Sequence, residues 1–206
     1  ATGAQAAPGF QPTDASKSRR NNYAAYGEVG YTIQKLFLGA AVRYEDYDDA
    51  SGDTIVGKVN GRYEITSWLA VRGAASTGVR APGLAQEHYA ASSSQFRQVN
   101  GVLDLLQIKT LPVGSREAIA LGAEPLKPEK SKNYSLGVTL EPLPRLSVTL
   151  DAYEIDVDGR IAITSTLTGA GVSNILIANG LPGSLSAQYY TNAIDTRTRG
   201  ENSRPR

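Results

Sequence analysis

The sequence contains few residue combinations that could bind a metal ion. The acidic stretch from Asp46 to Asp53 has the composition of a calcium loop. A calcium loop of the EF-hand type needs Asp or Asn at its fifth position and Gly at its sixth. Here Ala50 occupies the fifth position and Gly52 comes one residue late. We therefore interpret residues 46–53 as a solvated hairpin loop and predict no metal site.

Covalent catalysis has equally little support. His88 is the only histidine and cysteine is absent, which excludes thiolate sites and clusters of several histidines. No serine stands in the nucleophile-elbow setting that a Ser-His-Asp hydrolase requires. The pair Gly169 and Gly171 lacks the third glycine of a dinucleotide-binding loop. The sequence thus predicts no enzyme, no catalytic residue and no cofactor.

The remaining chemistry is that of charged and aromatic side chains that could bind a ligand. Basic residues on alternating segments, or where such a segment enters a long connection, could donate hydrogen bonds to an anionic iron chelate or a carboxylate. These candidates are Arg43, Lys58, Arg62, Arg72 and Arg80. Binding residues also concentrate on loops carried by rigid scaffolds. The loop candidates are His88, Tyr89, Phe96 and Arg97. The alternative remains that the charges pair with one another or with another domain, or are solvated.

Length and composition narrow the class of protein. The chain has 206 residues and a net charge of +1, so no strong attraction to nucleic acid is expected. It has no methionine and does not begin with a signal peptide, which indicates a segment of a longer protein. No apolar run approaches the ~18 residues of a membrane helix.

Seven segments alternate with a period of two, which predicts an all-β protein. They are 22–32, 36–45, 54–65, 68–76, 133–141, 146–157 and 189–199. In most of them one face is apolar and the other is polar. The polar faces carry Glu28, Arg43, Lys58, Arg62, Glu64, Arg72 and Asp151. That is too much charge for a dry core, in which an unpaired ion costs several kcal/mol.

The connections between these segments fall into two classes. Tight turns are expected at 33–35, at 66–67 and from Pro142 to Pro144. The longer connections are 46–53, about fifty loop-like residues between 77 and 125, and 158–188 with a short ordered piece at 174–178. Short turns at one end and long loops at the other are typical of an antiparallel transmembrane β-barrel. Tyr23 and Tyr31, about 26 Å apart along one strand, would suit its two aromatic girdles.

Four stretches resemble the TonB-dependent outer-membrane receptors. They are Ser76 to Pro82, Leu126 to Tyr134, Leu38 to Tyr44 and Asn192 to Gly200. The resemblance implies that residues 1–200 are part of the β-barrel domain of such a receptor, which has 22 strands. The plug domain and the closing C-terminal strands of the family are absent from the sequence. The tail 201–206 departs from the pattern of alternating apolar residues.

The resemblance also implies a function and a location. Such a receptor lies in the outer membrane of a Gram-negative bacterium, binds a scarce ligand, most often a ferric siderophore, and imports it with TonB-coupled energy. Its expected partners are outer-membrane lipid, the plug domain of the same chain, a TonB-type energy-transducing protein and the small ligand. A passive porin-like channel and a soluble β-sandwich binding module are the two alternatives.

Overall fold

A computed structural model describes residues 9–10, 12–99, 102–143 and 145–205. The chain divides into two compact units, each built from three stretches of sequence. The strand unit comprises residues 21–81, 128–160 and 194–206, and the loop unit comprises residues 1–20, 82–127 and 161–193. Among the described residues, no helix has the length and apolar character needed to cross a membrane.

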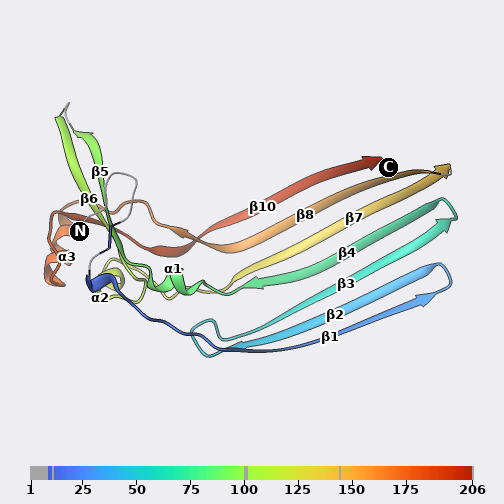
Figure 1. Cartoon of the computed structure of the whole chain (residues 1–206), viewed down its shortest axis with the longest axis horizontal. Coiled ribbons are helices and arrows are strands. Elements are labelled where there is room, and N and C mark those ends of the chain that lie inside the picture. The colour runs from blue at the N-terminus through green and yellow to red at the C-terminus, as the bar shows by residue number, and fades with distance from the viewer. Residues whose placement is uncertain (1–8, 11, 100–101, 144, 206) are drawn as a thin grey trace. The chain divides into compact units, whose positions relative to one another are not determined.

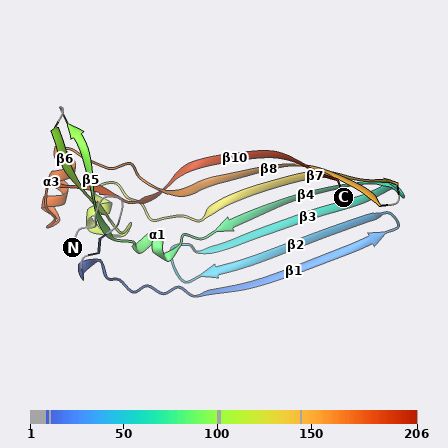
Figure 2. The same cartoon turned by 45° about the horizontal axis from the view of Figure 1, so that its top comes forward.

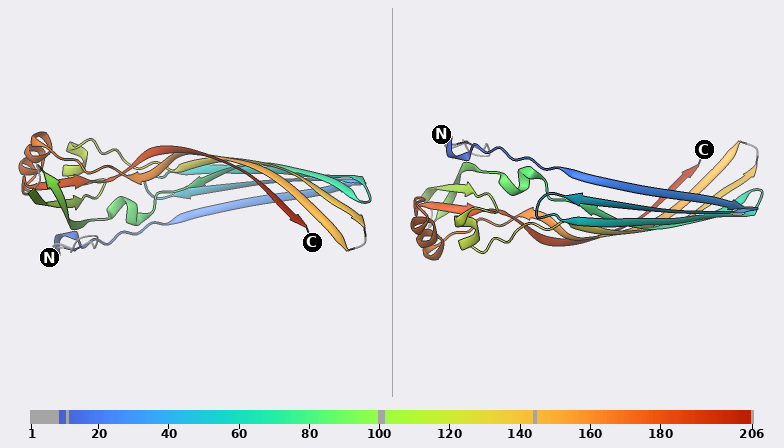
Figure 3. Two further views of the ribbon diagram at one scale, coloured as in Figure 1. Left: turned by 90° about the horizontal axis from the view of Figure 1, so that it is seen from above. Right: turned by 90° about the horizontal axis from the view of Figure 1, so that it is seen from below.

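The strand unit is built on a sheet in which the described residues form seven strands, in the order β1-β2-β3-β4-β7-β8-β10 (Figures 1 and 2). Their bounds are Asn22–Ile33 (β1), Leu36–Tyr47 (β2), Asp53–Thr66 (β3), Leu69–Arg80 (β4), Glu129–Leu143 (β7), Leu146–Ile163 (β8) and Tyr190–Pro205 (β10). The predicted β-fold is confirmed, and each strand overlaps the segment predicted for it. Strand β10 also includes residues 201–205 of the tail. Seen from above and below (Figure 3), the ends of β7, β8 and β10 turn away from β1–β4, so the sheet is twisted.

The register of the sheet sorts side chains onto two faces. Val29 pairs with Ala40, Ala40 with Val59, Val59 with Ala75, and Ala75 with Tyr134. Residues directly opposite each other in a ladder point to the same side, and neighbours along a strand point to opposite sides. The apolar positions of β1–β4 and β7 therefore share one face, which we call the apolar face. The other, charged face carries the predicted basic residues.

Short turns join the strands at one end of the sheet. Residues 34–35 connect β1 to β2, and Gln34 adopts a φ of 52° there. Residues 67–68 connect β3 to β4. A turn was predicted from Pro142 to Pro144. Its predicted start was wrong, because β7 continues through Leu143. A register shift between Leu140 and Leu143 accommodates Pro142, which has no N–H to donate to a ladder. Pro144 lies outside the described residues.

The loop unit contains more regular structure than the sequence predicted. Its elements are the 3₁₀ turn η1 (Pro12–Asp14), helices α1 (Leu84–His88), α2 (Arg116–Ala120) and α3 (Ala170–Ala178), and strands β5 (Ala91–Val99), β6 (Val102–Thr110) and β9 (Leu185–Gln188). The prediction of about fifty loop-like residues was wrong. Strand β6 pairs with β5 and, in parallel, with β9, which lies more than seventy residues further along the chain. Periodicity within one segment cannot reveal such a partner.

A buried apolar core holds the loop unit together. It contains Leu111, Val113, Ala118, Ala123, Leu126, Leu176, Ala187 and Tyr189. The hydroxyl of Tyr189 donates to the carbonyl of Leu121 at 3.2 Å, so the one phenol in this core is satisfied. The strand unit differs, since its large apolar side chains stay exposed: Val29 by 66%, Ile55 by 68% and Leu136 by 67%.

Candidate functional site

The four basic residues predicted on the strands, and Arg80, which was predicted at the entry to the long loop, lie on one face of the strand unit. Lys58 pairs with Ala41 and Ser76 in the ladders, and Arg62 pairs with Arg72. Arg43 and Arg80 fall on the same face by alternation along β2 and β4. The predicted shared face of Arg43, Lys58, Arg62 and Arg72 is therefore confirmed, while a role of any of the five in ligand binding stays a prediction.

Carboxylates on the same face neutralise the arginines. Arg43 Nε lies 2.5 Å from Glu45 Oε1, and Arg62 lies 2.5 Å from Glu64 Oε1. Arg80 Nε donates to Glu129 Oε2 at 2.9 Å. These contacts support the alternative that much of this charge is paired within the wall. Because such partly exposed pairs contribute only about 0–1 kcal/mol, a strongly anionic ligand could still compete for the guanidinium groups.

The longest-range ion pair on this face crosses a whole strand. Arg72 on β4 donates from Nη2 to both carboxylate oxygens of Asp151 on β8, at 2.7 and 2.8 Å, although β7 lies between them. The pair passes over Gly137 of β7, where an added Cβ would lie 2.9 Å from Arg72 Nε and would collide with the carboxylate. The glycine provides the space that this bidentate pair needs.

A cleft of about 410 Å³ adjoins Lys58 on the charged face. Tyr26, Glu28, Arg43, Lys58 and Ser76 contribute to its lining. Within the residues that the structure describes, Lys58 makes no ion pair. The ammonium group of Lys58, the phenol of Tyr26 and the hydroxyl of Ser76 are donors that line this cleft together with the carboxylate of Glu28. Sequence reasoning missed Tyr26 and Ser76 as site residues, although both occupy polar-face positions in the alternating pattern.

The loop candidates lie in or near α1 and β5, and their role in ligand binding stays a prediction. His88 is an exposed residue at the end of α1, and Phe96 on β5 is 57% exposed. The ring of Tyr89 packs edge-on against Phe10 with centroids 6.4 Å apart. Of Arg97, only the backbone is described, and its predicted role falls outside the described side chains.

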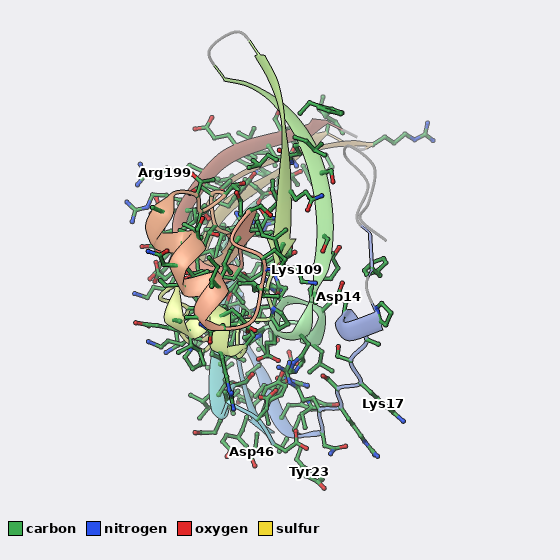
Figure 4. All side chains as sticks on the ribbon, turned by 90° about the vertical axis from the view of Figure 1, so that its left-hand side faces the viewer. Asp14, Lys17, Tyr23, Asp46, Lys109 and Arg199 are labelled. Carbon is green, nitrogen blue, oxygen red and sulfur yellow. The ribbon has the colours of Figure 1, made fainter. Side chains whose placement is uncertain are left out.

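Two anchors of the loop unit escaped sequence reasoning because their partners are distant in sequence. Lys109 forms an ion pair with Asp14, whose side chain is only 3% exposed (Figure 4). Arg20 lies 3.1 Å from Glu87 of α1 and also donates to the carbonyl of Pro82. Neither partner could be found from local spacing. Across the described part of the chain, no group of three or more His, Cys, Asp or Glu residues could hold a metal ion.

These features define a class of protein. A sheet with one exposed apolar face and one charged face, with tight turns at one end and long connections at the other, is part of the wall of a transmembrane β-barrel. The TonB dependent receptor-like β-barrel family model matches residues 1–200, and the chain belongs to this family. Members of this family are transport receptors of the Gram-negative outer membrane. No curated protein matches the sequence.

Several solved structures are similar to the chain. The siderophore receptor PirA from Pseudomonas aeruginosa aligns with a TM-score of 0.64 and 18% identity over 90% of this chain and 31% of that protein. The ferric enterobactin receptor PfeA from the same organism gives 0.63 and 16%, over 95% and 26%. The hemophore receptor HasR from Serratia marcescens gives 0.62 and 13%, over 90% and 31%. The chain thus spans between a quarter and a third of these relatives and shares their fold.

Proposed function

We propose that this chain is part of an active transporter that binds a ferric siderophore and imports it with TonB-coupled energy. The observation that carries the proposal is the register of the strand unit. It places Arg43, Lys58, Arg62 and Arg72 on one face and a continuous apolar surface on the other. Family membership favours a receptor over a passive porin-like channel or a soluble β-sandwich. The proposed role involves no covalent chemistry.

The charged face would look into the barrel lumen, because only the apolar face can meet lipid at low cost. The cleft beside Lys58 offers an ammonium group, a phenol and a hydroxyl at one place. Oxygen-rich ferric chelates are anionic and accept hydrogen bonds from such donors. We therefore propose Lys58 and Tyr26 as ligand contacts, with the arginines as exchangeable partners. His88, Tyr89, Phe96 and Arg97 of the loop unit remain proposed ligand-binding residues.

A plug domain of the full receptor would meet the same charged face. Half-exposed pairs such as Arg62–Glu64 and Arg72–Asp151 present both signs of charge to it. The TonB-type protein would then act on that plug domain. The expected consequence is that ligand uptake, but not ligand binding, depends on the energy-transducing partner.

A binding titration of the full receptor that carries this segment tests the proposal. Ferric enterobactin is the first probe, and iron-free enterobactin and haem are the comparisons, since one structural relative is a hemophore receptor. We expect quenching of intrinsic fluorescence to saturate with the ferric chelate. Lys58→Gln should weaken binding about tenfold, since a charge-assisted hydrogen bond is lost. The control Lys35→Gln, in the turn after β1, should leave the affinity unchanged.

Two outcomes would contradict the proposal. Tighter binding of haem than of ferric enterobactin would show that the ligand is haem and not a ferric siderophore. Equal affinity of the Lys58→Gln variant and its control would remove the charged face from the binding site. Growth on the ferric chelate as sole iron source, measured with and without the TonB-type protein, tests the energy coupling separately.

A further inference from the structure

The apolar face carries a groove that the transport function does not use. Two adjoining depressions, of about 670 and 560 Å³, share Val29, Ala40, Val59 and Ala75 in their linings. Their common row runs directly across β1–β4 in the register of the sheet. The groove therefore lies wholly within the strand unit, mainly over apolar-face positions, although Glu28 and Lys58 also contribute to the lining of the larger depression.

Small residues form the floor of the groove and large ones its sides. Gly57, Gly61 and Gly73 expose the backbone along the floor, and the sides include Tyr31, Leu38, Val42 and Tyr134. A Cβ built on Gly57 would meet only the carbonyl oxygen of Ala41 at 3.6 Å, and one built on Gly73 would meet nothing closer than 3.5 Å. A Cβ built on Gly61 would contact Leu38 Cδ2 at 3.4 Å, so the groove is narrowest there, and its lining is mainly apolar, as an acyl chain requires.

A positive charge closes one end of the groove. Lys132 contributes to its lining, and it sits next to Tyr134 on the apolar face, toward the end of the sheet with the long connections. Its ladder partner Asp156 is held by Arg197, with Nε and Oδ1 2.5 Å apart. Among the described residues, Lys132 itself forms no ion pair. Asp156 still interacts electrostatically with Lys132, and in a membrane the exposed ammonium group would lie near the lipid headgroups, beyond the aromatic girdle.

We propose that this groove is a specific site for a phosphate-bearing lipid of the outer leaflet. One acyl chain lies over Ala40, Gly61 and Ala75, and the phosphate accepts hydrogen bonds from Lys132. The apolar face of an outer-membrane barrel is surrounded by lipid, so lipid is the occupant with access to this surface. The exposed ammonium group of Lys132 selects an anionic headgroup by charge complementarity.

Native mass spectrometry of the delipidated full receptor in detergent tests the site with two probes of identical acyl chains. Dipalmitoyl phosphatidic acid carries the phosphate, and dipalmitoylglycerol does not. We expect one saturable phosphatidic acid per receptor, bound about tenfold more tightly than the glycerol lipid. Lys132→Ala should abolish this difference, whereas Lys35→Ala at the opposite end of the sheet should preserve it.

Filling the groove provides the second arm of the test. Ala75→Leu or Gly57→Val should weaken binding of both lipids about tenfold, because the side chain occupies the space of the acyl chain. The matched control Ala25→Leu lies on the same face outside the groove and should bind as the unaltered receptor does. The heat-dependent gel shift of folded barrels confirms that each variant is intact. Equal binding of the two lipids, or equal losses in variants and controls, would overturn the proposal.

Discussion

The strand unit and the loop unit are stabilised in opposite ways. The strand unit leaves side chains such as Val29 and Leu136 about two-thirds exposed, and its strands are joined mainly by ladder hydrogen bonds and cross-strand ion pairs. The loop unit buries Leu176 and Ala118 completely in an apolar core. The first arrangement is stable only where lipid covers the apolar face, and the second is that of an ordinary water-soluble domain. The same chain therefore contains one unit suited to lipid and one unit suited to water.

The two long connections of the chain fold together. Residues 82–127 supply β6 and α2, and residues 161–193 supply α3 and β9. Their parallel pairing between β6 and β9 and their common core make them one folded body. Two loops that share a core cannot rearrange independently without exposing it. If ligand binding moves these loops, they should move together.

The largest effect is expected from a substitution that disrupts the core of the loop unit. Leu176→Ala removes a fully buried side chain and should destabilise the loop unit by about 2–5 kcal/mol. Hydrogen exchange of the full receptor should then speed up in α2 and β6 as well as in α3, while β1–β3 keep their protection. Ile177→Ala is the matched control, since Ile177 is 60% exposed. Faster exchange confined to α3 would show that the two connections fold separately.

A smaller effect is expected from the wall of the strand unit. Gly137→Ala places a methyl group in the path of the Arg72–Asp151 pair and should cost about 1–3 kcal/mol in the free energy of unfolding. Gly27→Ala is the control, since a Cβ there would meet nothing within 4 Å. Denaturant unfolding of the full receptor measures both.

A double-mutant experiment tests whether the Arg72–Asp151 ion pair is the reason that β7 needs glycine at position 137. In a background that carries Asp151→Ala, the methyl group no longer collides with the carboxylate, so Gly137→Ala should cost much less than in the unaltered receptor. An equal cost in both backgrounds would show that the ion pair is unrelated to the need for glycine.

The contrast between the units also explains what could be predicted from the sequence. Alternation along each strand predicted the sheet and the shared face of Lys58 and Arg72, because the period of two is a local property. The ladder partners of Ala91–Val99 and Leu185–Gln188 lie in other segments, and β5 begins with polar serines that carry no strand pattern. Likewise, the pairing of Lys109 with Asp14 depends on tertiary structure alone.

The smallest expected effect concerns a single hydrogen-bonded carboxylate where β1 begins and β2 ends. The backbone N–H of Asn21 and then its side-chain amide donate to Asp48, at 2.9 and 2.7 Å, and they hold the pKa of this carboxyl below its usual range. The lowered pKa means that the contact stabilises the hairpin above the pKa of the unfolded chain, and that this contribution disappears as the pH falls through the folded value. Asn21→Ala removes the side-chain donor and should raise the pKa of Asp48 toward normal. A carboxyl-carbon NMR titration of the full receptor would measure this change, and a pKa that stays low in Asn21→Ala would assign the shift to the backbone donor alone.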